Sequence, residues 1–502
     1  MNKIVKLDQL KNIRKKFNNK KIILAHGVFD FFHHGHLQHL RKAKSYGDIL
    51  VVSLTADKFI LKGPGRPLYN QEIRVDFINH IDFVDFVTIV NFPSGVEVIN
   101  KLKPDYYAKG VEYKNQNKDF TKAIISEKQA LKSIGGQILY TNEPIMSSSN
   151  LINNFTLPKT AKEFLDKFKI KNSSFDIIKK FSLIKNKKVL VIGDAIFDEY
   201  ISTSGLAKSP KEEIVSAKEE NRKLYYGGII ATVQHISNFV FKPTLITVLA
   251  NDLKLNKSLI KKLKNTSINY KLFFSKKKNI IKTRFLDENN KKLFQSNLVD
   301  FEDIENSVEK KILNYLYKNI KKYDLVIAND FGHGLLTKNI KSFLENKSKL
   351  LCLNVQTNSA NFGYNFFYKY KKCNYLTMDE PEARLAVVDR FGNSNVIAKK
   401  IVKKINTNLV SITYGGNGTR VFKSNLTDKI VKIPAFSNKI VDTLGAGDAY
   451  FAISSLYYSV CKDPEIVGFI GNVAGALKTQ YLGHEKSLNT SSVFPYIKSL
   501  LS

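Results

Sequence analysis

At 502 residues the chain is too long for one typical domain, and about two or three domains are expected. Its 43% hydrophobic and 25% charged residues describe an ordinary globular protein, with no apolar run that could cross a bilayer and no recognisable signal peptide. The net charge of +34 comes from lysines scattered through every segment, a pattern that argues against a dedicated nucleic-acid-binding face.

The three cysteines, Cys352, Cys373 and Cys461, lack the spacing of metal or redox motifs. We therefore expect free thiols in a reducing compartment, and a cytoplasmic protein that acts on neither nucleic acid nor membranes. A nucleic-acid-binding role stays open as a hypothesis, because such binding would show itself by a steep dependence on salt.

The first predicted domain begins with an amphipathic helix over residues 8–18 and a short apolar strand over 21–26. A glycine-rich turn over 27–36 leads into a helical pattern. A fully apolar strand follows at 48–54, as in a parallel sheet covered on both faces. Strand, glycine-rich turn, helix and strand in this order are typical of a nucleotide-binding βαβ unit.

Two histidines in this turn, His33 and His36, carry the predicted chemistry. At the start of a helix they would place two hydrogen-bond donors beside an incoming phosphate, without either being a metal ligand. A single histidine in such a place is usually a satisfied core residue. Two of them around a glycine, directly after a buried strand, favour a functional site.

Three later segments support a nucleotide site. Lys62 lies on a loop over 61–67 and Arg74 follows near the start of a helix, so that both supply cations. Lys109 follows a strand-like segment, and Ser148 and Ser149 offer hydroxyl and N–H groups to the β- and γ-phosphates. A serine triplet is usually only a helix cap, so this last element is supporting evidence.

The string G-x-F-D-x-x-H-x-G-H at 27–36 resembles the cytidylyltransferase-like nucleotidyltransferases. The resemblance implies that His33 and His36 stabilise the charge on the α-phosphate while a sugar phosphate attacks and pyrophosphate leaves. It implies nucleotide contacts from the following residues: Gly27, Phe29, Lys62, Lys109, Ser148 and Ser149. The segment 107–113 departs from the family's K-G-x-D-Y element, because Glu112 stands in place of Asp.

Residues 156–186 combine Pro158, two short amphipathic patterns and many lysines, and predict a partly helical linker. The expected domains are therefore 1–155 and 187–502. Alternating strands and helices in both predict an α/β protein of two doubly wound domains.

The second domain is expected to begin with a strand over 188–194 that ends in Asp194, with Asp198 four residues on. Carboxylates at the carboxyl end of such a strand are well placed for sugar hydroxyls, although they could equally cap a turn. Gly227 and Gly228 follow in a second glycine motif, and strand-and-turn segments recur at 324–334 and 410–418. Between these two segments, 375–382 ends in an acidic stretch.

The stretch 442–451 reads as a tight glycine-rich turn that runs into an apolar helix. The first N–H groups of that helix and its dipole would face a phosphoryl group in transfer, and Asp448 would take the proton of the acceptor hydroxyl. A glycine loop that merely caps a core helix is the alternative for any short glycine motif.

The longer string D-T-x-G-A-G-D-x-x-F at 442–451 resembles the signature of the ribokinase-like, or phosphofructokinase B, sugar kinases. The resemblance implies that Asp448 is the base, that Asp194, Asp198, Gly227 and Gly228 bind the sugar, and that Asp379 and Glu382 organise Mg²⁺. It implies ATP contacts from the following residues: Thr413, Gly415, Gly418, Thr443, Gly445, Ala446, Gly447 and Asn472. Ala231 replaces an expected Asn, His333 an expected Lys and Asp379 an expected Asn.

Together the two halves resemble the bifunctional ADP-heptose synthases, with the domain order reversed. The resemblance implies a kinase for heptose 7-phosphate and an adenylyltransferase for heptose 1-phosphate, with ATP and Mg²⁺, and by analogy a homodimer. Four alternatives stay open: a different sugar, CTP in the first domain, one half that serves only as a binding module, and the nucleic-acid-binding role above.

Overall fold

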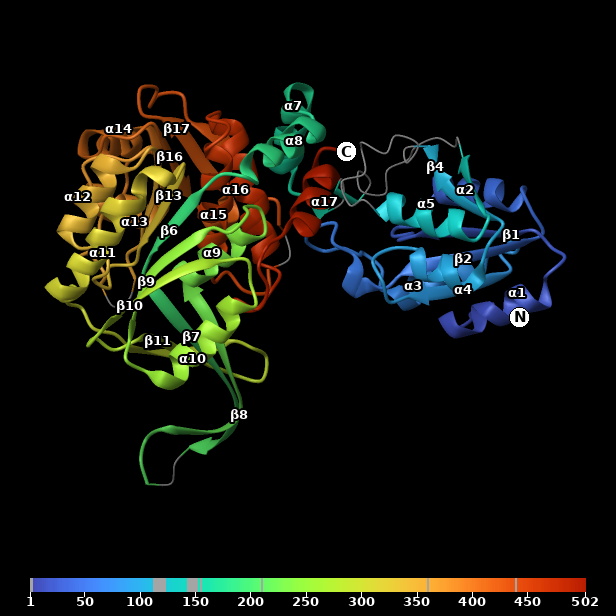
Figure 1. The fold of residues 1–502 in the computed structure, drawn as a ribbon, viewed down its shortest axis with the longest axis horizontal. Coiled ribbons are helices and arrows are strands. Elements are labelled where there is room, and N and C mark those ends of the chain that lie inside the picture. The colour runs from blue at the N-terminus through green and yellow to red at the C-terminus, as the bar shows by residue number, and fades with distance from the viewer. Residues whose placement is uncertain are drawn as a thin grey trace. The chain divides into compact units, whose positions relative to one another are not determined.

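The computed structural model describes residues 3–111, 123–141, 152–153, 156–208, 211–358, 361–437 and 440–502. Two compact units make up the chain (Figure 1). The first unit is Met1–Phe175 with Ser491–Ser502, and the second unit is Asp176–Thr490. The last helix, α17 (Thr490–Leu500), thus groups with the first unit, whereas the sequence predicted one uninterrupted second domain from residue 187 onward.

The described part of the first unit holds a five-stranded parallel sheet in the order β3-β2-β1-β4-β5. Its strands are β1 (Ile22–Gly27), β2 (Ile49–Thr55), β3 (Phe86–Val90), β4 (Tyr106–Gly110) and β5 (Gln137–Thr141). Its helices are α1 (Leu10–Lys16), α2 (His34–Lys44), α3 (Gln71–Asn79), α4 (Val96–Leu102), α5 (Ala123–Ser133) and α7 (Lys159–Lys171). Helix α8 (Ser174–Ile184) contains the boundary between the units.

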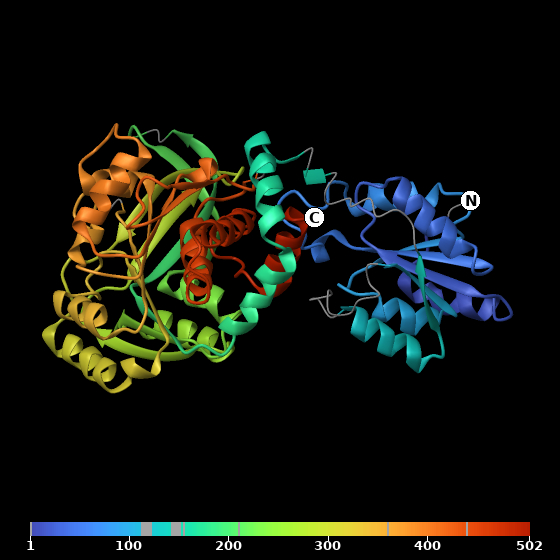
Figure 2. The ribbon, with the colours of Figure 1, turned by 90° about the horizontal axis from the view of Figure 1, so that it is seen from above.

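Side chains that alternate along the strands build two apolar layers in this unit. Ile23 and Ala25 of β1 pack with α2 and α3, whereas Ile22 and Leu24 pack with α1, α4 and α5. Figure 2 shows helices on both sides of the sheet. Because both faces are covered, every position of β2 and all of β1 except Gly27 are buried, which explains the largely apolar sequences of these two strands.

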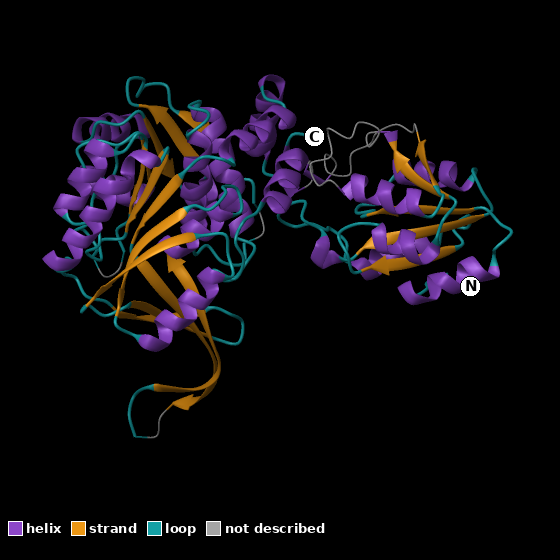
Figure 3. Cartoon of the chain, in the orientation of Figure 1, coloured by secondary structure: helices purple, strands orange, loops and turns teal. Residues whose placement is uncertain are grey.

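The second unit is built on a nine-stranded sheet, counted over the described residues, in the order β10-β9-β6-β13-β14-β15-β16-β17-β18. Its strands are β6 (Val189–Gly193), β9 (Thr244–Ala250), β10 (Asn269–Ser275), β13 (Leu325–Asp330), β14 (Leu351–Val355), β15 (Tyr375–Asp379), β16 (Leu409–Thr413), β17 (Thr419–Lys423) and β18 (Val431–Ile433). All pairs are parallel except β16–β17 and β17–β18 (Figure 3).

Helices cover both faces of this sheet as well. One apolar core joins it to α11 (Asn306–Asn319), α12 (Lys338–Lys347), α13 (Glu380–Val387) and α14 (Ser394–Lys404). Helices α9 (Ile229–Ser237), α15 (Ala446–Tyr458) and α16 (Pro464–Lys478) pack together and are buried along nearly their whole length. Helix α10 (Leu253–Lys264) follows β9. The predicted fold class is confirmed in both units.

A second, four-stranded sheet of the second unit has the order β12-β11-β7-β8. It consists of β7 (Ala195–Lys208), β8 (Val215–Gly228), β11 (Ile280–Leu286) and β12 (Lys292–Leu298). Strands β7 and β11 pair in parallel although more than seventy residues separate them in the sequence. In the part of the chain that the structure describes, no helix is both long and apolar enough to cross a membrane.

Candidate active sites

The predicted nucleotide turn of the first unit lies at the switch point of its sheet. Strands β1 and β4 are adjacent in the centre, and the chain continues from them toward opposite edges. β1 ends at Gly27 and β4 at Gly110. Ligands of doubly wound sheets bind at the carboxyl ends of the strands at such a point. The fold therefore brings the 27–36 turn and Lys109 to one place.

The two predicted histidines lie directly against each other. Their rings stack with centroids 4.0 Å apart and an angle of 18° between the planes. His33 caps α2, and its Nδ1 accepts a hydrogen bond of 3.1 Å from the Gly35 N–H, so that a neutral ring carries its proton on Nε2. Burial lowers the pKa of both rings, and that of His36 falls to about 3. Both histidines are therefore neutral donors at pH 7.

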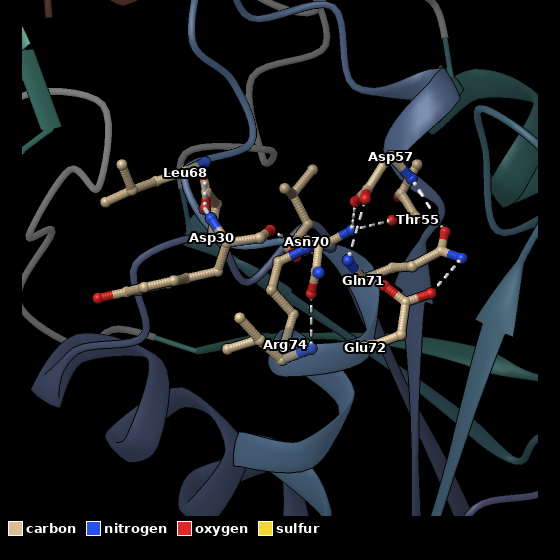
Figure 4. A network of polar contacts seen from close by, with 11 residues as sticks. Asp30, Thr55, Asp57, Leu68, Asn70, Gln71, Glu72 and Arg74 are labelled. Carbon is tan, nitrogen blue, oxygen red and sulfur yellow. Dashed lines mark hydrogen bonds and ion pairs between the residues drawn. The ribbon is translucent and has the colours of Figure 1, made fainter.

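The backbone of this turn is held in a strained conformation. Phe29 and Phe31 both have a φ of 48°, in the left-handed region that side chains with a Cβ rarely adopt. Between them Asp30 accepts hydrogen bonds of 2.9 and 3.2 Å from the N–H groups of Leu68 and Tyr69 (Figure 4). The Phe29 ring meets the His36 ring edge-on at 5.4 Å. A distant loop thus fixes the shape of the turn.

Arg74 supports the same framework and is not free for a phosphate. Its side chain is 1% exposed and donates to the carbonyls of Val28 and Thr55 and to the Asp57 carboxylate (Figure 4). The sequence predicted a cation beside the nucleotide, and that prediction is wrong for Arg74. Buried guanidinium groups need several acceptors, and the carbonyl groups around this turn supply them.

The two predicted lysines have different surroundings. Burial lowers the pKa of Lys62, and the Lys62 charge in turn lowers the pKa of His36, which places the ammonium group near that ring. Lys109 makes a buried ion pair of 3.0 Å with Glu127, whose other oxygen accepts from the Gly95 N–H. Sequence reasoning missed Glu127, because nothing marks its helix as part of a site. Ser148, Ser149 and Glu112 lie outside the described residues.

In the second unit the predicted glycine turn caps helix α15. Gly445 has a φ of 74°, and a Cβ there would lie 2.6 Å from the His484 ring, so glycine is required on both counts. At Gly447 the situation is the reverse. Among the described residues no atom lies within 4 Å of where its Cβ would be. Gly445 is therefore needed for packing, whereas Gly447 leaves space open at the start of the helix.

Asp448 lies in the first turn of α15 and is 8% exposed. Its Oδ1 accepts hydrogen bonds of 3.2 Å from Asn329 and 3.0 Å from Gln356. Burial raises the pKa of this carboxyl, while the His484 side chain and the two amide donors act in the opposite direction. A fixed carboxylate with a raised pKa beside an open helix N-terminus suits a general base.

A cavity of about 540 Å³ opens beside this turn, and it gathers eight predicted residues: Asp379, Thr413, Gly415, Gly418, Thr443, Ala446, Gly447 and Asn472. The predicted Gly445 and Glu382 do not line it. Phe436, Tyr450 and Ala476 supply apolar walls that sequence reasoning missed. Both amide hydrogens of Asn472 are engaged by the carbonyls of Ile433 and Pro434. The volume and mixed lining suit a nucleotide.

Asp379 and Glu382 hold each other at the start of α13. Asp379 accepts from the Glu382 N–H at 2.8 Å, and Glu382 accepts from the N–H groups of Asp379 and Thr357. Burial and the neighbouring Asp379 charge raise the pKa of Glu382. Within the described residues no group of three or more His, Cys, Asp or Glu side chains could hold a metal alone. The pair fits a Mg²⁺ ion that keeps its own waters.

Asp198 forms a buried ion pair with Arg284 and lies 3.5 Å from the His484 ring. The charged partners outweigh burial and lower the pKa of Asp198 to about 2. A Cβ at Gly227 would lie 1.9 Å from Asp198, and Gly228 has a φ of 57°. The two predicted glycines thus let β8 pass close to the carboxylate.

Asp194 is engaged by a loop of its own unit. Its two oxygens accept from the N–H groups of His333 and Leu335, and burial together with Asp330 raises its pKa to about 7. Its described partners are therefore structural, and a contact with the sugar stays a prediction.

Two side chains of this region, Lys282 and His333, have no hydrogen-bond partner among the described residues, and sequence reasoning missed Lys282, which pairs with Asp198 across strands β11 and β7. Lys282 of β11 is 9% exposed, and in the described part of the chain its ammonium group has no hydrogen-bond or ion-pair partner. His333 is 3% exposed, and neither ring nitrogen has a partner among the described residues. Burial and the Lys282 charge lower the pKa of His333 to about 3. The signal was the i, i+2 spacing of Lys282 and Arg284, which places both on one face of a strand.

Comparisons with known proteins agree with this geometry. The model of the family described as "Cytidylyltransferase-like" matches residues 24–180, and the model of the "pfkB family carbohydrate kinase" matches residues 186–491. Bifunctional protein HldE of Aliarcobacter butzleri is 28% identical over 338 residues, 63% of this chain and 68% of the relative. HldE of Geobacter metallireducens is 36% identical over 155 residues, 30% of each chain, and that of Campylobacter concisus is 35% identical over 116 residues, 25% of its length.

Solved structures resemble the second unit. Ribokinase from Thermotoga maritima has a TM-score of 0.50 at 16% identity and covers 62% of this chain and 99% of its own. Ribokinase from Giardia lamblia has a TM-score of 0.50 at 13% identity and covers 61% and 99%. Identities this low show the fold alone. The kinase match covers more than half of the chain, so the chain belongs to the pfkB family of carbohydrate kinases and carries a cytidylyltransferase-like nucleotidyltransferase domain ahead of its kinase.

Proposed function

We propose that the second unit phosphorylates the anomeric hydroxyl of D-glycero-β-D-manno-heptose 7-phosphate, and that the first unit transfers an adenylyl group to heptose 1-phosphate. The end product is ADP-heptose. A separate phosphatase must remove the 7-phosphate between the two steps. The HldE relatives support this assignment, and the partial coverage of their length leaves the sugar itself as a proposal.

The observation that carries the proposal is the unpartnered pair Lys282 and His333. A buried ammonium group without an acceptor is unfavourable by several kcal/mol, and the same holds to a smaller degree for imidazole nitrogens without partners. An anion that enters with the substrate would remove this cost. A sugar that already carries a phosphate fits such a place, because its oxygens could accept hydrogen bonds from the Lys282 ammonium group, whereas a sugar without a phosphate offers no anionic acceptor.

In the kinase step the acceptor oxygen forms a bond to the γ-phosphorus, and the bond from that phosphorus to the β,γ-bridging oxygen breaks. The acceptor proton passes to Asp448, which Asn329 and Gln356 hold in place. The N–H groups at the start of α15 face the phosphoryl oxygens, because Gly447 leaves that space open. Mg²⁺ supplies charge neutralisation between the phosphates when bound, and Asp379 and Glu382 would hold its waters.

In the nucleotidyl step a phosphate oxygen of the sugar 1-phosphate attacks the α-phosphorus, and pyrophosphate leaves. The neutral His33 and His36 donate hydrogen bonds to the α-phosphate oxygens, and Lys62 and Lys109 add positive charge at the same edge of the sheet. ATP is the proposed nucleotide, and CTP is the alternative that the same phosphate contacts would serve. By analogy with ribokinase-like enzymes we also propose a homodimer, and a cytoplasmic location where ATP is available.

Mass spectrometry of the protein with heptose 7-phosphate, ATP and Mg²⁺ tests the kinase assignment, and a heptose bisphosphate is the expected product. The matched control is the same heptose without its 7-phosphate, which should react at least about tenfold more slowly. Equal rates for the two sugars would refute the phosphate site. No product from heptose 7-phosphate, together with pyrophosphate release from another sugar 1-phosphate, would move the assignment to a different sugar. No kinase product from any sugar would favour a second unit that only binds.

A further inference from the structure

The last helix of the chain packs on a nucleotide loop of the first unit. Tyr496 of α17 is 3% exposed, and a Cβ at Gly63 would lie 2.2 Å from its ring. The ring therefore lies directly on the Gly63 backbone, which has a φ of 115° that favours glycine. No side chain other than hydrogen fits at Gly63 while Tyr496 occupies this position.

A polar path joins α17 to the same loop. The Asn153 side-chain amide donates to the Ser499 carbonyl of α17, and its oxygen accepts a hydrogen bond of 3.1 Å from Arg66. Arg66 lies 3.9 Å from Asp30 in a buried ion pair. Asp30 is the residue that holds the strained turn before His33. The helix thus reaches the histidine turn through two intermediates.

Lys62 is the residue next to Gly63 in the sequence. Its ammonium group lies close enough to His36 to lower the pKa of that ring. The position of this charge depends on the backbone at Gly63 and Arg66, which the Tyr496 ring and Asn153 hold from the outside. A displacement of about 1 Å at a group that contacts a reacting phosphate can cost about a hundredfold in rate.

Helix α17 begins where the kinase match ends, so Tyr496 lies outside both family matches, which cover residues 24–180 and 186–491. The contact of Tyr496 with the loop is therefore made by a residue beyond the matched kinase segment. Helix α17 thus follows the kinase segment in the sequence, yet residues 491–502 group with the first unit.

We propose that Tyr496 is a positioning residue for nucleotidyl transfer, which acts by holding the 62–66 loop so that Lys62 lies beside His36. The proposal rests on His33 and His36 forming the nucleotidyl-transfer site. Tyr496 itself touches no substrate. Removing its ring should loosen the loop, raise the KM for the nucleotide and leave phosphorylation by the second unit unchanged.

The test compares Tyr496→Ala with the conservative Tyr496→Phe in the full chain. Hydrogen exchange is measured first, without any substrate, so its result is independent of which sugar the enzyme uses. In Tyr496→Ala the amides of 61–69 should exchange at least about tenfold faster, those of 27–36 should also accelerate, and those of the second unit should keep their wild-type rates. Tyr496→Phe keeps the ring on Gly63 and should match wild type.

The kinetic part uses pyrophosphate release from ATP with heptose 1-phosphate. Tyr496→Ala should raise the KM for ATP about tenfold with a smaller change in kcat, and Tyr496→Phe should restore both. Loop exchange that stays at the wild-type rate in Tyr496→Ala would overturn the proposal, as would equal losses of nucleotidyl transfer and phosphorylation. If wild type releases no pyrophosphate with this sugar, the sugar assignment fails while the exchange result still decides the role of Tyr496.

Discussion

The two proposed sites, each of which would handle a phosphate in transfer, present opposite side-chain chemistry. The first unit presents two neutral histidines and the lysines Lys62 and Lys109. The second unit presents the buried carboxylate Asp448 with a raised pKa. The two proposed nucleophiles, a sugar phosphate and a sugar hydroxyl, explain this difference in side-chain chemistry. A sugar phosphate is already ionised, so its site needs only positive charge and donors, whereas a sugar hydroxyl carries a proton that a base must remove.

The largest expected effect comes from Asp448→Ala. Without the carboxylate nothing at the start of α15 accepts the hydroxyl proton, so phosphorylation should fall at least about a thousandfold. Pyrophosphate release by the first unit should stay near the wild-type rate, which serves as the internal control for folding. Both activities are measured on one preparation of the variant. Loss of both to the same extent would show that the two sites are not separate.

The mirror experiment is His36→Ala. Loss of one donor to the α-phosphate should lower kcat for pyrophosphate release by about a hundredfold to a thousandfold and leave phosphorylation unchanged. His39→Ala is the matched control, because this neighbouring histidine of α2 is bonded to Thr141 and lies outside the stacked pair. A loss of similar size in His39→Ala would argue for a structural role of the histidine cluster.

An intermediate effect is expected from Lys282→Ala, which removes the proposed contact with the substrate phosphate. The KM for heptose 7-phosphate should rise about tenfold to a hundredfold, with little change for an acceptor without phosphate. Lys271→Ala, an exposed lysine on β10 of the same unit, is the control for net charge. Steady-state kinetics with both acceptors separate the outcomes. A uniform rise in KM for the two acceptors would place the phosphate elsewhere.

The smallest effect concerns pH. Asp448 must be ionised to act as a base, so kcat/KM for phosphorylation should fall as the pH drops through its raised pKa. The Gln356 donor favours the ionised form. Gln356→Leu should therefore raise that pKa further and move the acid limb of the pH profile to higher pH. A limb that stays in place, or moves to lower pH, would mean that a different group titrates.

Regular elements and motifs were determined by the sequence alone. Strands predicted at 21–26, 48–54 and 188–194 occur within one residue of these bounds as β1, β2 and β6, because short apolar runs are typical of strands buried on both faces of a sheet. His33, His36 and Asp448 were equally visible, since each lies within one short motif whose local turn fixes its direction.

Only the tertiary structure decided which distant residues meet. Lys282 lies beside Asp198 because β11 pairs with β7 across more than seventy residues, and Glu127 reaches Lys109 from a helix without any motif. Arg74 carries the positive charge that a phosphate site needs, but its side chain is buried and donates to backbone carbonyl groups instead. No pattern within the sequence of α17 indicated that this helix groups with the first unit. Periodicity records how a segment is buried, whereas its partner is set by long-range packing, which leaves no signal in the segment itself.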